Sequence, residues 1–335
     1  MNGKRLFCLN IVFFVVISVM QPVKCWAITA EELIEKCQKA ESAIRDVSVE
    51  YEWHIIPPPT LEEVKEGMDN VQASVAKDGF IKFKLSAARF FGSSDVNSVL
   101  SPYRWRVLSE ESTTIIAEKG ACWNDWTKES YDGQTYKKTN VGGWPTLIQS
   151  GLISARSWED LRMKVKMSPI GFSIFRFELD GDNVMLSALL RQRALKDSLR
   201  MGSPVEKVGD FNTICVELLL QIESRKVPIR RIYFSIQHNY TPVKYEYFDP
   251  TKEGVRLWRT VEVQSLQSVG NGLWFPSSGI IQNEDSPRAD VFQVIGKILV
   301  NQGLTEKDFD VEFPVGTRVT DQVRNVEYVV KAPKD

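Results

Sequence analysis

The sequence predicts an α+β fold in which helices cover one face of an antiparallel β-sheet. Near the start of the chain, apolar residues recur at the spacing of a helix. Over most of the remainder they alternate with polar residues at the spacing of a strand. Of the 335 residues, 43% are hydrophobic and 25% are charged, which supplies a packed core and excludes a disordered or collagen-like chain.

The first residues have the character of an export signal. Lys4 and Arg5 supply a basic start, and the apolar run that follows over residues 11–20 is short for a membrane span. Two small residues, Cys25 and Ala27, then flank a bulky one in the pattern that signal peptidase accepts. We therefore place cleavage after Ala27.

We expect a signal peptide over 1–27 and a single exported domain over 28–335, because no Ser/Gly linker or internal repeat divides the remainder. The alternative of a lipidated Cys25 is less favoured, because Lys24 stands where lipoprotein signals have a small residue. The whole chain balances 42 basic against 43 acidic residues, so nucleic acid is not an expected partner.

Two segments have helical spacing behind a capping box, a Ser or Thr followed three residues later by Glu. Thr29 with Glu32 opens the first segment, and Thr60 with Glu63 opens the second. The apolar stripe of the first is Leu33, Cys37, Ala40, Ile44 and Val47. The stripe of the second is Leu61, Val64, Met68, Val71 and Val75. We also expect a short helix capped by Ser187 that runs toward Gly202.

Strand-like alternation begins at Phe80 and dominates the second half of the chain. Its apolar members are Ile81, Phe83 and Leu85; Tyr103, Trp105 and Val107; Ile214, Val216, Leu218 and Leu220; Ile232, Phe234 and Ile236; Tyr245 and Tyr247; and Val261 and Val263. Asp132-Gly133 and Asn271-Gly272 mark hairpin turns, because glycine tolerates the positive φ that a tight turn requires. An antiparallel sheet is implied.

Reactive side chains are few. The two histidines, His54 and His238, are far apart in the sequence and neither belongs to a metal-ligand spacing, so we interpret both as structural or exposed. A nucleophile elbow and a phosphate-binding glycine loop are both missing from the sequence. We therefore predict a protein that is not an enzyme and has no cofactor, metal or catalytic residue. An exported hydrolase remains an alternative hypothesis.

Three cysteines follow the expected cleavage point, namely Cys37, Cys122 and Cys215. They permit one disulfide at most, which excludes a disulfide-stabilised scaffold and leaves open whether any bond forms. For Cys37 we favour a small buried residue of the first helix.

Short motifs in the same order resemble the periplasmic outer-membrane lipoprotein carrier and sorting proteins, the LolA/LolB-like group. They are YDGQT at 131–135, NYTPVK at 239–244 before YEY at 245–247, GLWFP at 272–276 and FPVGT at 313–317. The resemblance implies a strongly curved antiparallel sheet, an incomplete barrel, with helices covering its concave face over an apolar cavity for acyl chains. It also implies a periplasmic location and a role in transport. This chain is longer than the carriers, with an additional segment at 61–75 and a longer middle.

On this basis we expect alternate strand residues to line the cavity. They are Ile214, Val216, Leu218, Ile232, Phe234, Ile236, Tyr245, Tyr247, Val261 and Val263. The expected partner is a lipid or an acylated lipoprotein, with peripheral membrane contact. An envelope sensor or scaffold that binds another envelope protein is the alternative. Ordinary packing of a core such as Ile232, Phe234 and Ile236 would give the same pattern.

Overall fold

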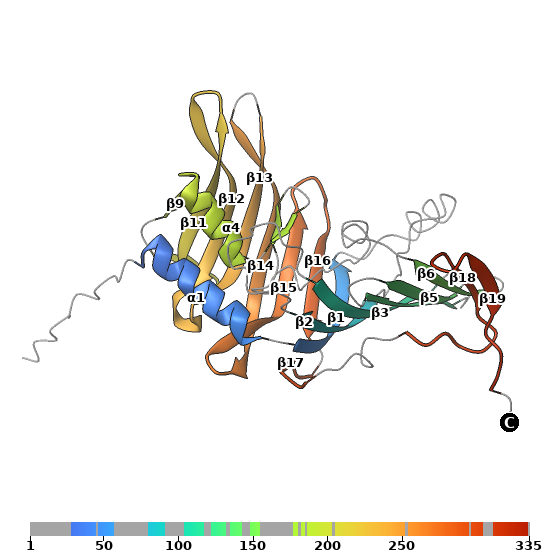
Figure 1. The fold of residues 1–335 in the computed structure, drawn as a ribbon. Helices are drawn as coiled ribbons and strands as arrows, with labels where there is room; N and C mark the ends of the chain where they lie inside the picture. The colour runs from blue at the N-terminus through green and yellow to red at the C-terminus, as the bar shows by residue number, and fades with distance from the viewer. Residues whose placement is uncertain are drawn as a thin grey trace, which may run out of the picture.

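The computed structural model describes residues 28–44, 46–56, 80–90, 104–116, 122–131, 135–142, 148–154, 177–179, 182–184, 186–202, 205–251, 254–294, 296–303 and 311–333. Within these residues the chain is mostly sheet, with two α-helices, one 17-stranded sheet and one two-stranded sheet (Figure 1). No described helix is both long and apolar enough to cross a membrane. The expected signal peptide and the expected helix at 61–75 lie outside the described residues.

The helices and strands have the following bounds. They are α1 Ala30–Ala43, β1 Asp46–Ile56, β2 Phe80–Phe90, β3 Arg104–Ile116, β4 Cys122–Tyr131, β5 Tyr136–Gly142, β6 Ile148–Ser154, β7 Phe177–Leu179, β8 Asp182–Val184, α4 Leu186–Leu195, β9 Leu199–Met201, β10 Glu206–Val208, β11 Phe211–Ile222, β12 Arg225–Ser235, η2 Ile236–His238, β13 Thr241–Pro250, β14 Val255–Gly270, β15 Leu273–Asn283, β16 Ala289–Val294, β17 Leu299–Val300, β18 Arg318–Asp321 and β19 Val326–Val329.

Helix α1 begins with the predicted capping box. The Thr29 hydroxyl accepts from the Glu32 N–H at 3.2 Å, and the Glu32 carboxylate accepts from the Thr29 N–H at 2.9 Å. The helix ends at Ala43, whose carbonyl accepts a hydrogen bond of 2.8 Å from Asn301. The predicted continuation through Val47 is wrong, because that residue is in β1, opposite Ala87 of β2.

Helix α4 begins at Leu186, so Ser187 lies inside its first turn rather than at the cap. The predicted extension toward Gly202 is also wrong. Asp197 takes a positive φ of 50°, and the Ser198 N–H donates to the Arg193 carbonyl at 2.8 Å. This 6→1 bond around a left-handed residue is a Schellman stop. The next residues form β9, which pairs with β11.

The large sheet is open among the described strands. At one edge β9 and β10 both pair with β11, and antiparallel pairs then follow chain order to β16. β16 pairs with β1, and further antiparallel pairs follow from β1 to β6. β18 lies parallel beside β6, and β19 forms the far edge. The antiparallel prediction therefore holds throughout this order except at the β6–β18 pair.

Turn chemistry positions the hairpins. Asn271 and Gly272 both take positive φ, 53° and 73°, at the predicted turn between β14 and β15. The turn predicted at Asp132-Gly133 lies outside the described residues, but the strands on either side pair as a hairpin through Tyr131 and Tyr136. Figure 1 shows α1 and α4 in front of the β11–β14 part, while β5, β6, β18 and β19 lie at the opposite end.

One hydrophobic cluster joins the helices to this part of the sheet. It contains buried residues of α1 and α4, among them Leu33, Leu189 and Leu190, together with buried residues of β11 to β16. Buried residues of both helices and of these strands therefore belong to one core. Burial of this kind supplies most of a helix's stability in a folded protein.

Candidate functional site

The predicted cavity lining converges on a row of residues that cross neighbouring strands. Val216, Ile232, Tyr245 and Val261 are successive cross-strand partners on β11 to β14, and we call these four the interior row. All four are buried, none more than 5% exposed. Burial raises the pKa of the Tyr245 hydroxyl, with smaller contributions from Tyr247 and from Cys37 and Glu41 of α1. Cys37 of α1 belongs to the same hydrophobic cluster as the row.

Four more predicted residues extend this face. Phe234 lies opposite Ile214, and both are buried. Leu218 continues β11 beyond Val216, and Val263 continues β14 opposite Gly279. The structure therefore brings eight of the ten predicted residues into one hydrophobic cluster as buried members.

The other two predicted residues have different surroundings. Ile236 belongs to the 3₁₀ turn η2 rather than to β12, because the chain turns after Ser235 before β13 begins. Tyr247 is half-buried and lies between two cations, with the guanidinium groups of Arg230 and Arg259 at 5.0 Å and 6.0 Å from its ring centre. The apolar face therefore becomes basic at the Tyr247 end.

A buried carboxylate joins the two helices. Glu41 of α1 is 2% exposed and accepts hydrogen bonds from Ser187 of α4, from its N–H at 2.9 Å and from its hydroxyl. The Ser187 N–H lies in the first turn of α4, where backbone donors have no partner within the helix. Arg191 of α4 adds an exposed hydrogen bond of 2.9 Å to Gln38 of α1. Glu41 thus caps α4 from the neighbouring helix.

The opposite face of the same strands carries charge. Arg200, Glu217, Arg231 and Glu246 are successive cross-strand partners on β9, β11, β12 and β13, and we call them the outer row. Arg200 and Arg231 donate to the Glu217 carboxylate at 2.6 Å and 2.9 Å. Burial alone would raise the pKa of Glu217, but these two hydrogen bonds outweigh it and hold the pKa below its ordinary value.

The two described thiols lie on opposite sides of the sheet. Cys37 is a free, buried cysteine of α1, as predicted. Burial, and then Glu41, raises the pKa of its thiol. Cys215 is also free and buried, on the outer-row face, and burial raises its pKa to about 12. The side chain of Cys122 lies outside the described residues.

His238 has a packing role, as the sequence predicted. Its ring lies edge-on between Phe211 and Trp274, with ring centres 5.3 Å and 4.5 Å away, and Nδ1 is 2.8 Å from the Ser235 hydroxyl. Burial lowers its pKa. The backbone of His54 lies in β1 opposite Val291, and its side chain is outside the described residues.

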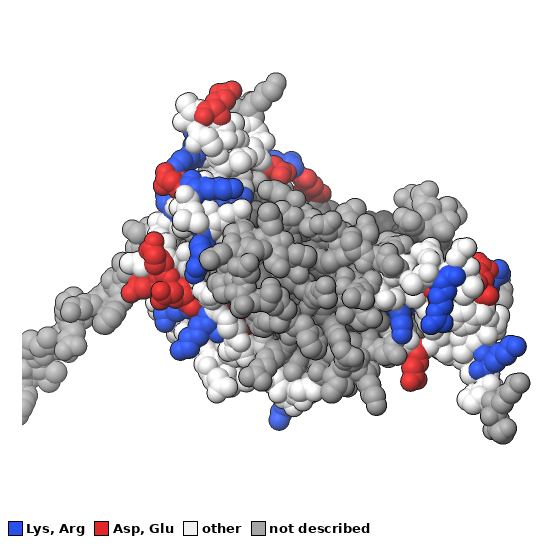
Figure 2. Space-filling view, in the orientation of Figure 1, with Lys and Arg blue, Asp and Glu red and all other residues white. Residues whose placement is uncertain are grey.

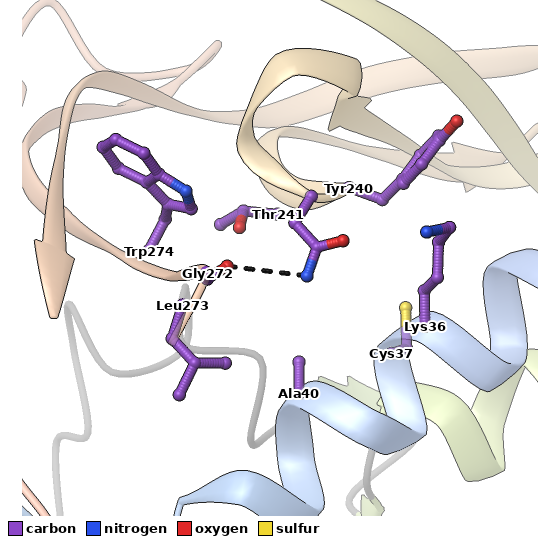
Figure 3. A pocket seen from close by; sticks show the side chains of 9 residues that line it. Lys36, Cys37, Ala40, Tyr240, Thr241, Gly272, Leu273 and Trp274 are labelled. Carbon is purple, nitrogen blue, oxygen red and sulfur yellow. Dashed lines mark hydrogen bonds between the residues drawn. The ribbon is translucent and has the colours of Figure 1, made fainter. Parts of the chain in front are cut away.

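A small cavity marks the margin between α1 and the sheet (Figure 3). It has a volume of about 10 Å³, room for about one water molecule. Ala40 and Cys37 line it from the helix, and Leu273 and Trp274 line it from β15. On the helix rim, the Lys36 ammonium lies 5.2 Å from the centre of the Tyr240 ring. The contact between α1 and the sheet is thus nearly closed at this point.

No protein family model matches the sequence, and no curated protein matches it significantly. Solved structures similar to the fold include a domain from Vibrio parahaemolyticus named for outer membrane lipoprotein sorting. It is 12% identical, with a TM-score of 0.40 over 84% of this chain and 97% of that one. A DUF1329 family protein from Desulfovibrio piger is 12% identical, with a TM-score of 0.43 over 84% and 95%.

Sequence reasoning missed two features of this region. Glu41 follows Leu33 and Cys37 at steps of four, so an acid stands in an apolar stripe, and that signal was available. The sequence predicts only part of the outer row. The strand period places Glu217 and Glu246 on the face opposite the interior row, but the match of Arg200 to Glu217 depends on the register of β9.

Proposed function

We propose that this protein is an exported, periplasmic carrier that binds acyl chains of a lipid or a lipoprotein between the helices and the sheet, without catalysis. In this proposal the sheet curves so that α1 and α4 cover its concave face. The interior row, with the buried residues beside it, forms the binding surface. The single observation that carries the proposal is the continuous apolar row, which crosses four neighbouring strands and belongs to one cluster with buried residues of α1 and α4.

The energetics suit a ligand that is bound and later released. Each buried methylene of an acyl chain contributes about 0.8 kcal/mol, so a chain can be held by an apolar surface alone. In this proposal the helices occupy that surface when no ligand is bound, which is supported by Leu33, Leu189 and Leu190 being members of the same cluster. A ligand must therefore displace helix contacts of similar chemistry, which leaves a moderate net affinity that permits transfer.

Fluorescent fatty acids of increasing chain length test the binding surface. Affinity should rise with each added methylene until the chain spans the row. Val261→Phe, which overfills the interior row, should weaken probe binding at least fivefold, an effect of about 1 kcal/mol. The matched control is Val319→Phe, which overfills a buried valine of β18 at the other end of the sheet and should leave binding unchanged.

Purification of the native protein from its envelope, followed by mass spectrometry, identifies the cargo. A co-purifying lipid or acylated protein supports the carrier. The carrier is refuted if the wild-type protein takes up no probe or if affinity is independent of chain length. A single stoichiometric protein partner trapped by cross-linking, with no lipid, would establish the sensor or scaffold instead.

A further inference from the structure

A second cross-strand row lies beside the interior row on the same face of the sheet. Arg230, Tyr247 and Arg259 are successive partners on β12, β13 and β14, and we call these three the basic row. Each stands two positions along its strand from a member of the interior row, so the side chains of both rows leave the same face. Two positions of a strand span about 7 Å. Positive charge therefore adjoins the apolar surface.

The basic row lies at the boundary between the core and the solvent. Its three residues are half-buried. On one side the row continues to Leu218 of β11, which is fully buried, and on the other side to Asn283 of β15, which is exposed. Figure 1 shows the hairpin ends of β11–β12 and β13–β14 extending beyond α1. This order matches a ligand with an apolar tail in the core and a polar head near the solvent.

Arg259 has a buried donor without a described acceptor. Its Nε is buried, and nothing among the described residues accepts a hydrogen bond from it. By contrast, four cations of the same strands form ion pairs with described carboxylates, namely Lys226, Arg231, Lys244 and Arg256. A buried donor without an acceptor is unfavourable, and a guanidinium suits a carboxylate or a phosphate because it can donate two parallel hydrogen bonds. The unsatisfied Nε therefore favours an anionic ligand.

Aromatic contacts hold the cations of the basic row in place. The guanidinium groups of Arg230 and Arg259 lie 5.0 Å and 6.0 Å from the centre of the Tyr247 ring, and the centre of the Trp258 ring lies 5.7 Å from it. A cation–π contact attracts the charge but supplies no acceptor oxygen. The N–H groups of Arg259 therefore remain able to bind an oxyanion.

We propose that the basic row binds the anionic headgroup, a carboxylate or a phosphate, of an amphiphile whose acyl chain lies on the interior row. This inference rests on the proposed carrier function and adds the charge of the ligand. The headgroup accepts hydrogen bonds from Arg259, and Arg230 supplies a second positive charge near the same ring. Figure 2 shows Lys and Arg side chains interspersed with Asp and Glu over the helix end of the molecule, so the preference comes from these residues and not from a general positive field.

Single-chain amphiphiles of equal length test the headgroup. Displacement of a fluorescent fatty acid by dodecanoate, dodecanol or dodecylammonium, each below its micelle concentration, measures three affinities. An apolar surface alone prefers the neutral alcohol, because burying an ion costs free energy. The basic row predicts the opposite order, with dodecanoate bound roughly tenfold more tightly than dodecanol and dodecylammonium bound most weakly. Dodecyl phosphate identifies the headgroup, because tighter binding than dodecanoate assigns the site to a phosphate and weaker binding assigns it to a carboxylate.

Substitutions separate the headgroup site from the acyl surface. Arg259→Gln should weaken dodecanoate binding by roughly tenfold and leave dodecanol binding unchanged. The matched control is Arg256→Gln, at an exposed arginine of the same strand that pairs with Asp285, and it should change neither affinity. Val261→Phe should weaken both, because it acts on the chain. Circular dichroism checks the fold, and the order of affinities in the wild-type protein decides the question if Arg259→Gln folds poorly.

The outcomes distinguish this inference from the carrier itself. Three results would overturn the headgroup site and leave the carrier standing. They are dodecanol bound at least as tightly as dodecanoate, an Arg259→Gln variant that binds dodecanoate like the wild type, and an equal loss in Arg256→Gln. A wild-type protein that binds none of the amphiphiles would overturn both proposals.

Discussion

Replacing Glu41 by alanine should destabilise the protein by about 2–4 kcal/mol. The Glu41 carboxylate is the acceptor for both the N–H and the hydroxyl of Ser187, in a place closed to water. Without it, two buried donors remain, and an unsatisfied buried donor costs about 1–3 kcal/mol. The α4 N-terminus also loses a favourable negative charge, which contributes about 0.3–1 kcal/mol.

The desolvation cost of the buried Glu41 carboxylate opposes this loss of stability, so the sign of the measured change shows which of the two is larger. Burying a carboxylate costs several kcal/mol, and the alanine variant no longer has that cost. If the hydrogen bonds from Ser187 and the α4 dipole compensate the buried charge, Glu41→Ala is destabilised as stated. Glu41→Gln, which keeps an acceptor oxygen but loses the charge, should fall between the alanine variant and the wild type.

Urea unfolding measures these free energies, provided that the slope of the unfolding free energy against urea concentration is the same in the variants and the wild type. Glu35→Ala, an exposed glutamate of the same helix, is the matched control and should stay within about 0.5 kcal/mol of the wild type. A double-mutant cycle with Ser187→Ala should give a coupling energy of at least about 1 kcal/mol. Should Glu41→Ala be as stable as the wild type, or more stable, the desolvation cost outweighs the cap and the reasoning fails.

Three further predictions follow from the sheet. Because the pKa of Glu217 is lowered in the folded state, Glu217→Gln should be less stable than the wild type at neutral pH. The stability difference should disappear as the pH falls through the folded pKa of Glu217, and thermal melts at a series of pH values measure that difference. Gly279→Ala should lower the free energy of unfolding by about 1–3 kcal/mol, because the new Cβ would lie 2.5 Å from the Phe292 ring and 2.6 Å from the Glu262 carbonyl oxygen. An unchanged midpoint of urea unfolding would contradict this prediction. Gly272→Ala should cost about 1 kcal/mol, since the turn requires a φ of +73°.

Local features of the fold were predictable because their causes are local. The capping box at Thr29 and Glu32 forms as predicted, since both partners are three residues apart in the chain. The turn at Asn271-Gly272 forms because glycine and asparagine tolerate positive φ. The alternation of β11 to β14 placed Val216, Ile232, Tyr245 and Val261 on one face, because side chains of a strand alternate.

Helix ends were predicted less well, because tertiary contacts decide them. The apolar stripe of α1 runs on to Val47 in the sequence, yet pairing with β2 draws that residue into β1. The cation pair around Tyr247 was also missed. It requires Arg230 and Arg259 to be the cross-strand neighbours of one residue, and strand period alone does not fix register.

The sequence by itself determined that helical spacing near its start gives way to strand spacing with one apolar face along the second-half strands, and it predicted the export signal. Only the tertiary structure decided that β1 joins β16 to β2, that β18 runs parallel to β6, and that Glu41 caps α4. These contacts link residues far apart in the chain, from Glu41 to Ser187 for example. The spacing of apolar residues predicts whether a segment forms a helix or a strand, but the packing of the whole chain determines which other element that segment contacts.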